Sequence, residues 1–246
     1  MPDMNDPLVS IIITAYRYER YVAYCVESCL AQTTEVPFEV IVIDDGSPDH
    51  TAEIARKYMP RVHVFSLPNG GVEKASNYGL AQARGKFVVR VDADDALKPD
   101  FLKTLAPYLQ QEGWSFLYSD YAMIDSEGNT ISQVNLPAFN PDEITGRGDF
   151  LATGTVYRSD VLKSLGYYNE EVPNCGLENY ELILRLLAAN AKGLHVAEAL
   201  FSYRVHSENM SLLRRKNIIN NGTKIAARFG LHAYSTNVNH PYKLVL

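Results

Sequence analysis

The chain has 246 residues, of which 46% are hydrophobic and 21% charged, so it can bury a core, and wholesale disorder is excluded. The formal net charge of −6 argues against a general nucleic-acid-binding protein, and we expect no nucleic-acid partner. No run approaches the ~20 apolar residues of a membrane span, and the first residues, MPDMNDP, lack the basic and apolar stretches of a secretory signal.

Strand and helix patterns alternate in the first half of the chain. Short β-branched runs that are apolar on both faces predict buried parallel strands, and apolar residues at i, i+3, i+4 and i+7 predict helices between them. This β-α-β spacing predicts an α/β fold with a mostly parallel, doubly wound sheet flanked by helices. We expect strands at 8–14, 38–43, 62–66 and 87–91, and helices at 22–30, from Pro48 onward with Ser47 as cap, at 72–83 and at 99–109.

The second half is less regular. Residues 135–150 contain two prolines and two glycines and are expected to form a surface loop. The last segment, 211–246, has six lysines and arginines and no acid, so it carries +6 and the rest of the chain −12. The expected elements are strands at 115–125, 130–134 and 194–205 and helices at 177–191 and 212–229.

Polar residues follow three of the expected strands, at the point where each strand ends. Ligands of doubly wound sheets bind outside the carboxyl ends of the strands, so these residues are expected to line one crevice. The three groups are Thr14-Ala15-Tyr16, Asp44-Asp45-Gly46-Ser47 and Asp92-Ala93-Asp94-Asp95.

Any one of these acids is equally well explained as a turn former or a helix cap. Several carboxylates that converge on one crevice repel each other, however, unless a cation or a hydrogen-bond donor lies between them. Mg²⁺ and similar hard cations are held by one or two carboxylates together with substrate phosphates. The chain has no G-x-G-x-x-G after its first strand and no G-x-x-x-x-G-K-[ST], which argues against a dinucleotide cofactor and against an ATPase.

Three consecutive segments, PLVSIIITAY, FEVIVIDDGSPDHT and NGGVEKASNYGLAQARGKFVVRVDADD, look like glycosyltransferase family 2. The likeness covers roughly the first 125 residues and resumes in GYYNEEV, GLENYELILRL and YRVHSENMS. It implies a GT-A fold, with a C-terminal acceptor-side lobe and a helical tail, and an inverting transfer from a nucleotide sugar. After the first strand the chain reads TAYRYERY, which departs from the Gly-rich, Arg-containing loop of nucleotidyltransferases with related folds.

The resemblance implies roles for matching positions of the nucleotide half. Asp45 would accept a hydrogen bond from the base, as a carboxylate can from a pyrimidine N3–H. Asp92 and Asp94 match the D-x-D motif: Asp92 would face the ribose, and Asp94 would coordinate a Mn²⁺ or Mg²⁺ ion between the phosphates. Asp95 is expected to cap the next helix. The residues that would border the base and ribose are Thr14, Ala15 and Tyr16.

Other candidate residues keep two interpretations. Lys74 is either a phosphate contact or an exposed helix lysine. His206 is either a metal or diphosphate ligand, as the resemblance implies, or a satisfied histidine. Cys25 and Cys29 share an apolar helix face and are expected to pack in the core, whereas Cys175 receives no role.

The family's catalytic base is the Asp of an E-D pair, and the matching pair here is Glu178-Asn179. An amide takes no proton at neutral pH, and three explanations remain open. Asn179 inactivates the site, Glu178 or Glu181 acts as base, or the protein binds its ligand without transfer. The sequence favours the first, because Glu178 would have to reach past the position of the family's base.

The prediction is therefore a metal-dependent inverting glycosyltransferase that uses a UDP- or dTDP-linked sugar in polysaccharide synthesis, with a non-catalytic binder as the alternative. Residues 1–125 would bind the nucleotide sugar, 126–210 the saccharide or lipid-linked acceptor, and 211–246 would form a basic tail. That tail is either a solvated helix face or a contact to anionic lipid. Three cysteines without a dense framework predict a cytoplasmic protein, with the inner membrane face as the second location.

Overall fold

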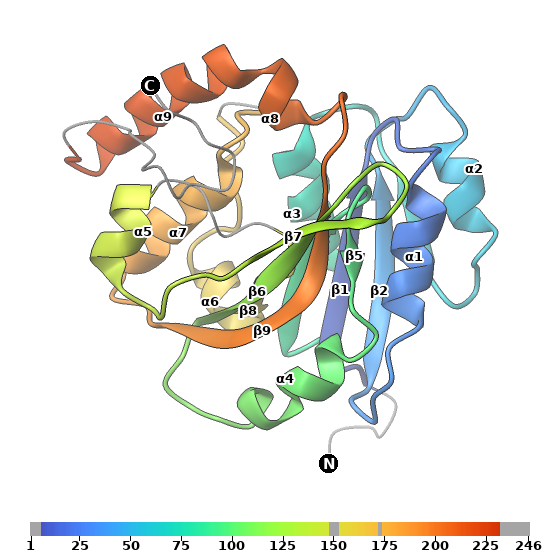
Figure 1. The fold of residues 1–246 in the computed structure, drawn as a ribbon, viewed down its shortest axis with the longest axis horizontal. Coiled ribbons are helices and arrows are strands. Elements are labelled where there is room, and N and C mark those ends of the chain that lie inside the picture. Colours follow the sequence, from blue (N-terminus) through green and yellow to red (C-terminus); the bar gives the residue numbers. More distant parts are fainter. Residues whose placement is uncertain (1–5, 148–152, 172–173, 232–246) are drawn as a thin grey trace.

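The computed structural model describes residues 6–147, 153–171 and 174–231, and the strands in these residues form one nine-stranded sheet (Figure 1). The strand order is β3-β2-β1-β4-β8-β6-β9-β5, with β7 paired to β6. The strands are β1 Val9–Ala15, β2 Phe38–Asp44, β3 His63–Ser66, β4 Phe87–Asp92, β5 Ala96–Leu97, β6 Phe116–Ile124, β7 Thr130–Val134, β8 Val156–Arg158 and β9 Gly193–Arg204. The helices are α1 Val22–Leu30, α2 Thr51–Arg56, α3 Val72–Gln82, α4 Phe101–Leu109, α5 Pro141–Arg147, α6 Ser159–Ser164, α7 Glu178–Ala188, α8 Met210–Leu213 and α9 Arg215–Arg228.

The N-terminal half is the expected parallel α/β unit. Strands β3, β2, β1 and β4 pair in parallel, and β1 is buried along its whole length because helices cover both faces of the sheet. The strand order reverses between β3 and β4, and right-handed crossovers then place α3 on the face opposite α1 and α2 (Figure 1). A Cβ at Gly79 of α3 would lie only 2.5 Å from Ile12 Cγ2, so glycine allows α3 to pack closely on the sheet. The reversal puts the switch point of the sheet at the carboxyl ends of β1 and β4.

The C-terminal half adds strands of both directions. β8 is antiparallel to β4 and to β6, β6 is parallel to β9, and β5 is antiparallel to β9. The α/β fold class is correct, but the mostly parallel arrangement holds only for the first half. β8 has three residues and β5 two, which is too short for a period-2 pattern to be visible in the sequence.

Several expected elements differ from the structure. The expected loop at 135–150 contains α5, and residues 148–150 lie outside the described residues. Helix α2 begins at Thr51 rather than near Pro48. At its start the Asp49 carboxylate accepts a hydrogen bond from the Thr51 backbone N–H at 3.1 Å. The single helix expected at 212–229 is divided into α8 and α9.

Helix α9 packs against α7 through an apolar cluster of its own. Ile218, Ile225 and Ala226 of α9 lie against Leu177, Tyr180 and Leu184. The opposite side of α7, with Leu182, Ile183 and Leu186, belongs to the main core. α7 is therefore buried on two sides, which a single apolar stripe does not predict.

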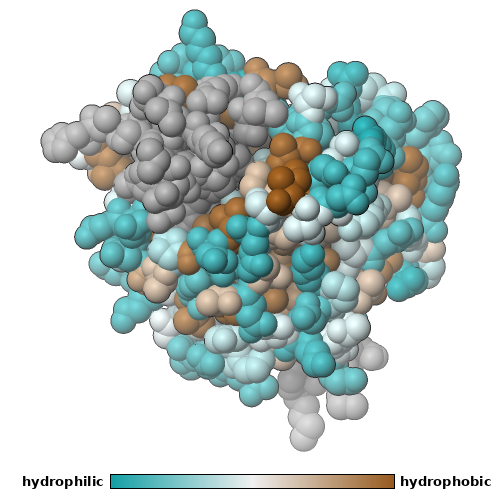
Figure 2. Space-filling view, in the orientation of Figure 1, coloured by the Kyte–Doolittle hydropathy of each residue, from teal (hydrophilic) through white to brown (hydrophobic). Residues whose placement is uncertain are grey.

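The surface is mostly hydrophilic on the face shown in Figure 2, where hydrophobic side chains appear in small groups outside the grey residues. No helix of the described ranges combines the length and the apolar composition that a membrane span requires. Cys25 and Cys29 are buried in the core, as expected. The start of the chain (1–5) and the end of the basic tail (232–246) lie outside the described residues.

Candidate functional site

A crevice of about 740 Å³ lies at the carboxyl ends of β1, β2 and β4, at the switch point of the sheet. The crevice brings together residues of all three expected groups. It also receives side chains from the loop before α7, from α7 itself and from the segment around α8. The predicted residues that line it are Thr14, Ala15, Tyr16, Asp45, Asp92, Asp94, Glu178 and Asn179.

Asp45 is buried at the crevice wall, and its carboxylate holds the loop before α3. Oδ1 accepts the Gly70 backbone N–H at 2.8 Å, and Oδ2 accepts the Gly71 backbone N–H at 2.9 Å and Asn69 Nδ2 at 3.1 Å. Burial raises the pKa of Asp45, and the two backbone N–H groups oppose this rise. Since each carboxylate oxygen can accept two hydrogen bonds, Oδ1 has room for one more donor from the crevice.

The turn after Asp45 requires glycine. Gly46 has a φ of +70°, and a Cβ there would lie 2.7 Å from the Asn69 backbone nitrogen. The β2 turn and the loop at 69–71 therefore pack directly against each other and fix one wall of the crevice.

The D-x-D turn presents two carboxylates of different environment. Asp92 is partly exposed and accepts hydrogen bonds from Thr153 Oγ1 at 3.1 Å and from Arg90 Nη2 at 3.4 Å. Asp94 is buried, and its Oδ2 lies 3.0 Å from His206 Nε2. Burial, followed by the charges of Asp94 and Asp92, raises the pKa of the Tyr18 phenol, which also lines the crevice.

This donor set fits a hard divalent cation in its chemistry. Carboxylate oxygens are the ligands that Mg²⁺ and Mn²⁺ prefer, and an imidazole nitrogen is a ligand of transition metals. Asp94 and His206 are adjacent as the resemblance implies, and they are joined to each other by a hydrogen bond. Asp92 and Asp94 line the same crevice, so both carboxylates are available to a ligand there.

Asp95 does not cap a helix, contrary to expectation, because α4 begins only at Phe101. Its Oδ1 accepts the Arg204 backbone N–H at 2.8 Å, and Arg204 Nε donates to the Asp94 carbonyl at 2.7 Å. Burial, with the charges of Asp94 and Asp92, raises the pKa of Asp95. These hydrogen bonds hold the end of β9 against the D-x-D turn and thereby place His206 next to Asp94.

Lys74 is exposed on α3 and does not line the crevice. The aliphatic part of the Lys74 side chain lies over Gly70, where a Cβ would come within 2.7 Å of Lys74 Cδ. Three arginines line the crevice instead: Arg17 and Arg20, which the sequence did not single out, and Arg214, which was expected in a solvated or lipid-facing helix. Arg17 directly follows the Thr14-Ala15-Tyr16 group and has a positive φ of 62°, which is rare for a residue with a side chain. The basic character of TAYRYERY was the available signal.

Glu178 and Asn179 begin α7, and both are buried at the crevice wall. Arg90 Nη2 donates to Glu178 Oε1 at 3.1 Å, and Asn179 Nδ2 donates to the same oxygen at 3.4 Å. Tyr168 Oη donates to Asn179 Oδ1 at 3.2 Å. Burial raises the pKa of Glu178, and the charge of Arg90 partly opposes the rise.

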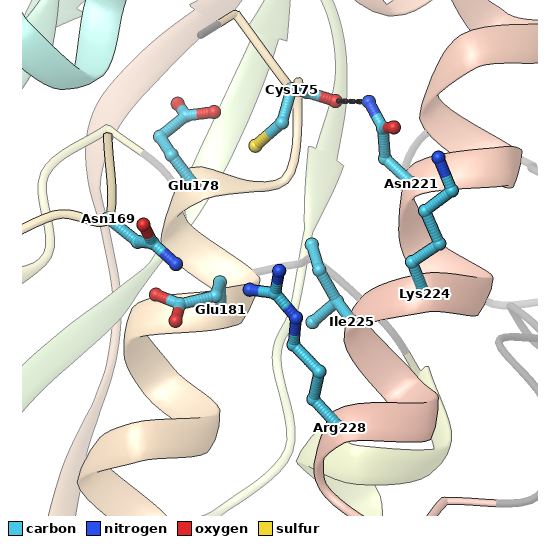
Figure 3. A pocket seen from close by; sticks show the side chains of 8 residues that line it. All are labelled: Asn169, Cys175, Glu178, Glu181, Asn221, Lys224, Ile225 and Arg228. Atoms are coloured by element: carbon cyan, nitrogen blue, oxygen red, sulfur yellow. Dashed lines mark hydrogen bonds between the residues drawn. The ribbon is translucent and has the colours of Figure 1, made fainter. Parts of the chain in front are cut away.

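Glu181 is placed differently, one turn further along α7. Both of its carboxylate oxygens accept hydrogen bonds from Arg185 Nε, at 3.0 and 2.9 Å. Glu181 does not line the crevice but a smaller cavity between α7 and α9, of about 40 Å³. Figure 3 shows Glu178 and Cys175 at one end of this cavity and Glu181 and Arg228 at the other. Glu181 is therefore separated from the crevice that Glu178 reaches.

One cluster of buried side chains has possible metal-ligand atoms that all lie within 4.8 Å of one another: Glu73, Cys175 and Glu178. Glu73 already accepts the backbone N–H groups of Asn174 and Cys175, at 2.7 and 3.0 Å. The Arg90 guanidinium, 3.1 Å from Glu178, repels a cation. The group therefore anchors the loop before α7 to α3, and burial raises the pKa of the Cys175 thiol.

Comparison with known proteins agrees with this geometry. Residues 10–165 match the family described as Glycosyl transferase family 2. The chain is 30% identical over 217 residues to a hyaluronan synthase of Pasteurella multocida, which covers 84% of this chain and 21% of that protein. It is 29% identical over 246 residues to a chondroitin synthase of Escherichia coli, covering 95% of this chain and 35% of that protein. The chain thus spans a fifth to about a third of the length of these relatives.

Solved structures share the fold. Staphylococcus aureus TarS, in complex with UDP-GlcNAc, superposes with a TM-score of 0.72 at 24% identity, over 92% of this chain and 67% of that chain. The Pyrobaculum calidifontis mannosyltransferase PcManGT, in complex with GDP-Man and Mn²⁺, superposes with a TM-score of 0.67 at 16% identity, over 98% of this chain and 69% of that chain. With the family match over more than half of its length, the chain belongs to glycosyltransferase family 2.

Proposed function

We propose that this chain is a metal-dependent inverting glycosyltransferase that moves a sugar from a UDP- or dTDP-linked donor to a hydroxyl of a growing polysaccharide. The observation that carries the proposal is the convergence of Asp45, Asp92 and Asp94 on one crevice at the switch point of the sheet. The named activities of the relatives, hyaluronan and chondroitin synthesis, support the polysaccharide class.

The nucleotide would bind along the carboxyl ends of β1 and β2. Thr14, Ala15 and Tyr16 line the crevice next to Asp45 and would border the base and the ribose. The remaining acceptor position of Asp45 suits the N3–H of uracil or thymine. The complex of TarS with UDP supports a uracil nucleotide.

The diphosphate would lie over the D-x-D turn, with Asp92 toward the ribose. Asp94 and His206 would hold a Mn²⁺ or Mg²⁺ ion, and PcManGT with Mn²⁺ supports this cofactor. When bound, such an ion neutralises the charge that develops on the departing diphosphate. Arg17 and Arg214 line the same crevice, and their guanidinium groups would add positive charge there.

The acceptor would enter from the side of α7 and α8, since residues 126–210 supply Glu178, Asn179 and Asn209 to the crevice. Residues 1–125 would then form the nucleotide-sugar half, as the sequence predicts. Lys216, exposed on α9, would contact anionic lipid near a lipid-linked acceptor. A cytoplasmic location at the inner membrane face accords with this acceptor class.

A second candidate is a binder that holds a nucleotide sugar or a glycan without transfer. It is favoured by one observation, the amide of Asn179 at the position of the family's base. The crevice carboxylates serve binding in both cases, so only turnover separates the two.

The test is a donor screen with two readouts. Thermal shift with UDP, GDP, dTDP and CDP, each with and without Mn²⁺, identifies the nucleotide. Release of nucleoside diphosphate from the matching sugar donors then measures transfer to oligosaccharides or, more slowly, to water. Nucleotide binding without release from any donor would leave the binder as the function.

A further inference from the structure

Glu178 occupies a position between two spaces in the protein. It lines the crevice together with Asn179, and it also lines the small cavity between α7 and α9 (Figure 3). Glu178 therefore does not have to reach past Asn179, as the sequence suggested, because its own side chain forms part of the crevice wall.

The hydrogen bonds around Asn179 give its amide a fixed direction. Tyr168 Oη donates to Asn179 Oδ1 at 3.2 Å, which turns the Nδ2 group toward Glu178. Arg90 approaches the same Glu178 oxygen at 3.1 Å, and 6% of its surface is exposed. Both donors reach Oε1, so Oε2 lies outside this pair of hydrogen bonds. Two N–H donors favour the charged form of a carboxylate, which is the form that accepts a proton.

We propose that Glu178 is the general base of this chain and that Asn179 is the positioning residue that orients it. The inference rests on the proposed function and names the group that completes its site. In the transfer step the acceptor O–H bond breaks and its proton passes to the Glu178 carboxylate. The acceptor oxygen forms the new bond to C1 of the sugar, and the C1–O bond to the diphosphate breaks, with its electron pair leaving on the diphosphate oxygen.

The charges around Glu178 explain why an amide suits position 179. Two further carboxylates already act on Glu178, those of Glu73 and Asp92, and a third at position 179 would add repulsion. The amide donates a hydrogen bond instead. Burial raises the pKa of Glu178 and makes it a better proton acceptor near neutral pH. The charged or titratable groups that face Glu178 are Arg90 and Asp92 of β4, Glu73 of α3, Cys175 of the preceding loop, and Lys224 and Arg228 of α9 across the cavity.

The experiment compares four proteins: the unaltered chain, Glu178→Gln, Asn179→Asp and Glu181→Gln. Each is assayed with Mn²⁺ for release of UDP or dTDP from a panel of their sugar conjugates, with glycosaminoglycan oligosaccharides or water as acceptor, between pH 5 and 9. UDP affinity is measured by calorimetry, and thermal unfolding checks the fold. Glu181→Gln is the matched control, because it is a buried glutamate of the same helix outside the crevice.

We expect the unaltered chain to turn over, with a rate that rises with pH as Glu178 loses its proton. Glu178→Gln should lower turnover by ~10²–10⁴-fold and remove this pH dependence, with UDP affinity within about twofold. Asn179→Asp should move the rise to higher pH, because a negative charge beside Glu178 raises its pKa. A purely structural role of either residue would leave the pH profile in place.

Three outcomes overturn the proposal. If Glu178→Gln retains turnover, Glu178 is not the base. If the unaltered chain is inactive and Asn179→Asp is active, Asn179 inactivates the site, Glu178 is not the base, and the unaltered chain is the binder. If all four proteins bind UDP and none consumes a donor, the proposed function itself fails and the binder remains.

Discussion

His206 Nε2 lies 3.0 Å from Asp94 Oδ2, although 112 positions separate the two residues. The contact depends on the end of β9, which Arg204 ties to the D-x-D turn through the backbone of Asp94 and the carboxylate of Asp95. Asn209 completes the arrangement by accepting the His206 backbone N–H at 2.6 Å. The C-terminal part of the chain thus supplies one candidate metal ligand, His206, and these hydrogen bonds place it beside Asp94.

Removing the Asp94 carboxylate should abolish the effect of a divalent cation on nucleotide binding. Asp94 is buried beside His206, and its carboxylate is the charged oxygen donor of the pair. In the unaltered protein we expect UDP to bind at least tenfold more tightly with Mn²⁺ than with EDTA, by calorimetry. Asp94→Ala should bind UDP equally in both conditions.

The control for this measurement is Asp100→Ala, which removes an exposed carboxylate that makes no capping hydrogen bond at the start of α4. It should keep the full Mn²⁺ effect. Equal UDP affinity with Mn²⁺ and EDTA in the unaltered protein would refute the metal assignment of Asp94.

Asp45→Asn should weaken both nucleotide binding and the fold. The substitution turns an NH₂ group toward donors that now face a carboxylate, the N–H groups of Gly70 and Gly71. We expect UDP affinity to fall by ~1.5–3 kcal/mol and the free energy of unfolding by ~1–3 kcal/mol. Calorimetry and urea unfolding measure the two losses separately.

The same variant tests the choice of base. If Asp45 accepts the pyrimidine N3–H, the unaltered protein should bind UDP more tightly than CDP, whose N3 carries no hydrogen, and Asp45→Asn should reduce this preference. Asp142→Asn, exposed on α5, should change neither quantity. Tighter binding of CDP than of UDP by the unaltered protein would contradict the role of Asp45.

The nucleotide side of the site could be predicted from sequence because local patterns determine it. Buried β-branched strands show where they end, and the residues that follow them, such as Asp45 and Asp94, must then share one sheet edge. The position of Lys74 shows the limit of such reasoning, since the helix was correct but the direction of the side chain was not visible.

The other wall of the crevice depends on contacts between distant segments. Arg214 and Ile218 line it because α9 docks on α7, where a Cβ at Gly176 would lie 2.7 Å from Ile218 Cγ1. Nothing in the local sequence indicates that Arg90 of the apolar strand β4 pairs with Glu178, because the two residues lie 88 positions apart. No local periodicity reports such pairs, so the basic tail was predicted as a solvated or lipid-facing helix rather than as part of the crevice.

Glu39→Gln should destabilise the protein at neutral pH but not at low pH. Burial alone would raise the pKa of Glu39, but hydrogen bonds from Ser10 and Arg84 overcome this and hold the pKa below its ordinary value. A carboxylate with a lowered folded-state pKa contributes stability that is present above its unfolded pKa and lost as pH falls through the folded pKa. We expect Gln to cost ~1–3 kcal/mol at pH 7, with the difference shrinking below about pH 4.3.

Urea unfolding of Glu39→Gln between pH 3 and pH 7 checks this behaviour, with the exposed Glu198→Gln as control. A difference between variant and unaltered protein that stays constant over this range would mean that the charge of Glu39 adds nothing to the fold.

Arg90→Met should destabilise the protein most strongly at high pH. The Arg90 guanidinium lies between two carboxylates, 3.1 Å from Glu178 and 3.4 Å from Asp92, and its buried Nε and Nη1 atoms have no hydrogen-bond partner among the residues that the structure describes. Burying this cation is therefore costly, and its positive charge offsets the charge of the two carboxylates beside it. Its removal leaves uncompensated buried charge, which costs ~3–5 kcal/mol at neutral pH.

The sign of the pH dependence follows from the pKa of Glu178, which is already raised by burial. Without Arg90 it rises further, so Glu178 is protonated in the folded variant over a wider range. A carboxyl group with a raised folded-state pKa costs nothing below its unfolded pKa, and the cost grows as pH rises through the folded value. The loss of unfolding free energy in Arg90→Met should thus be smallest near pH 5 and largest near pH 8, as measured with urea.

Arg90→Lys keeps the charge and should recover part of the loss at pH 8, whereas Lys86→Met, at an exposed lysine just before the same strand, should be nearly neutral throughout. UDP affinity of folded Arg90→Met should remain within a few-fold, because Arg90 does not line the crevice. A loss of stability that is the same at pH 5 and pH 8 would show that Arg90 supports the fold through packing alone, such as its contact with the Tyr168 ring at 5.6 Å, and not through its charge.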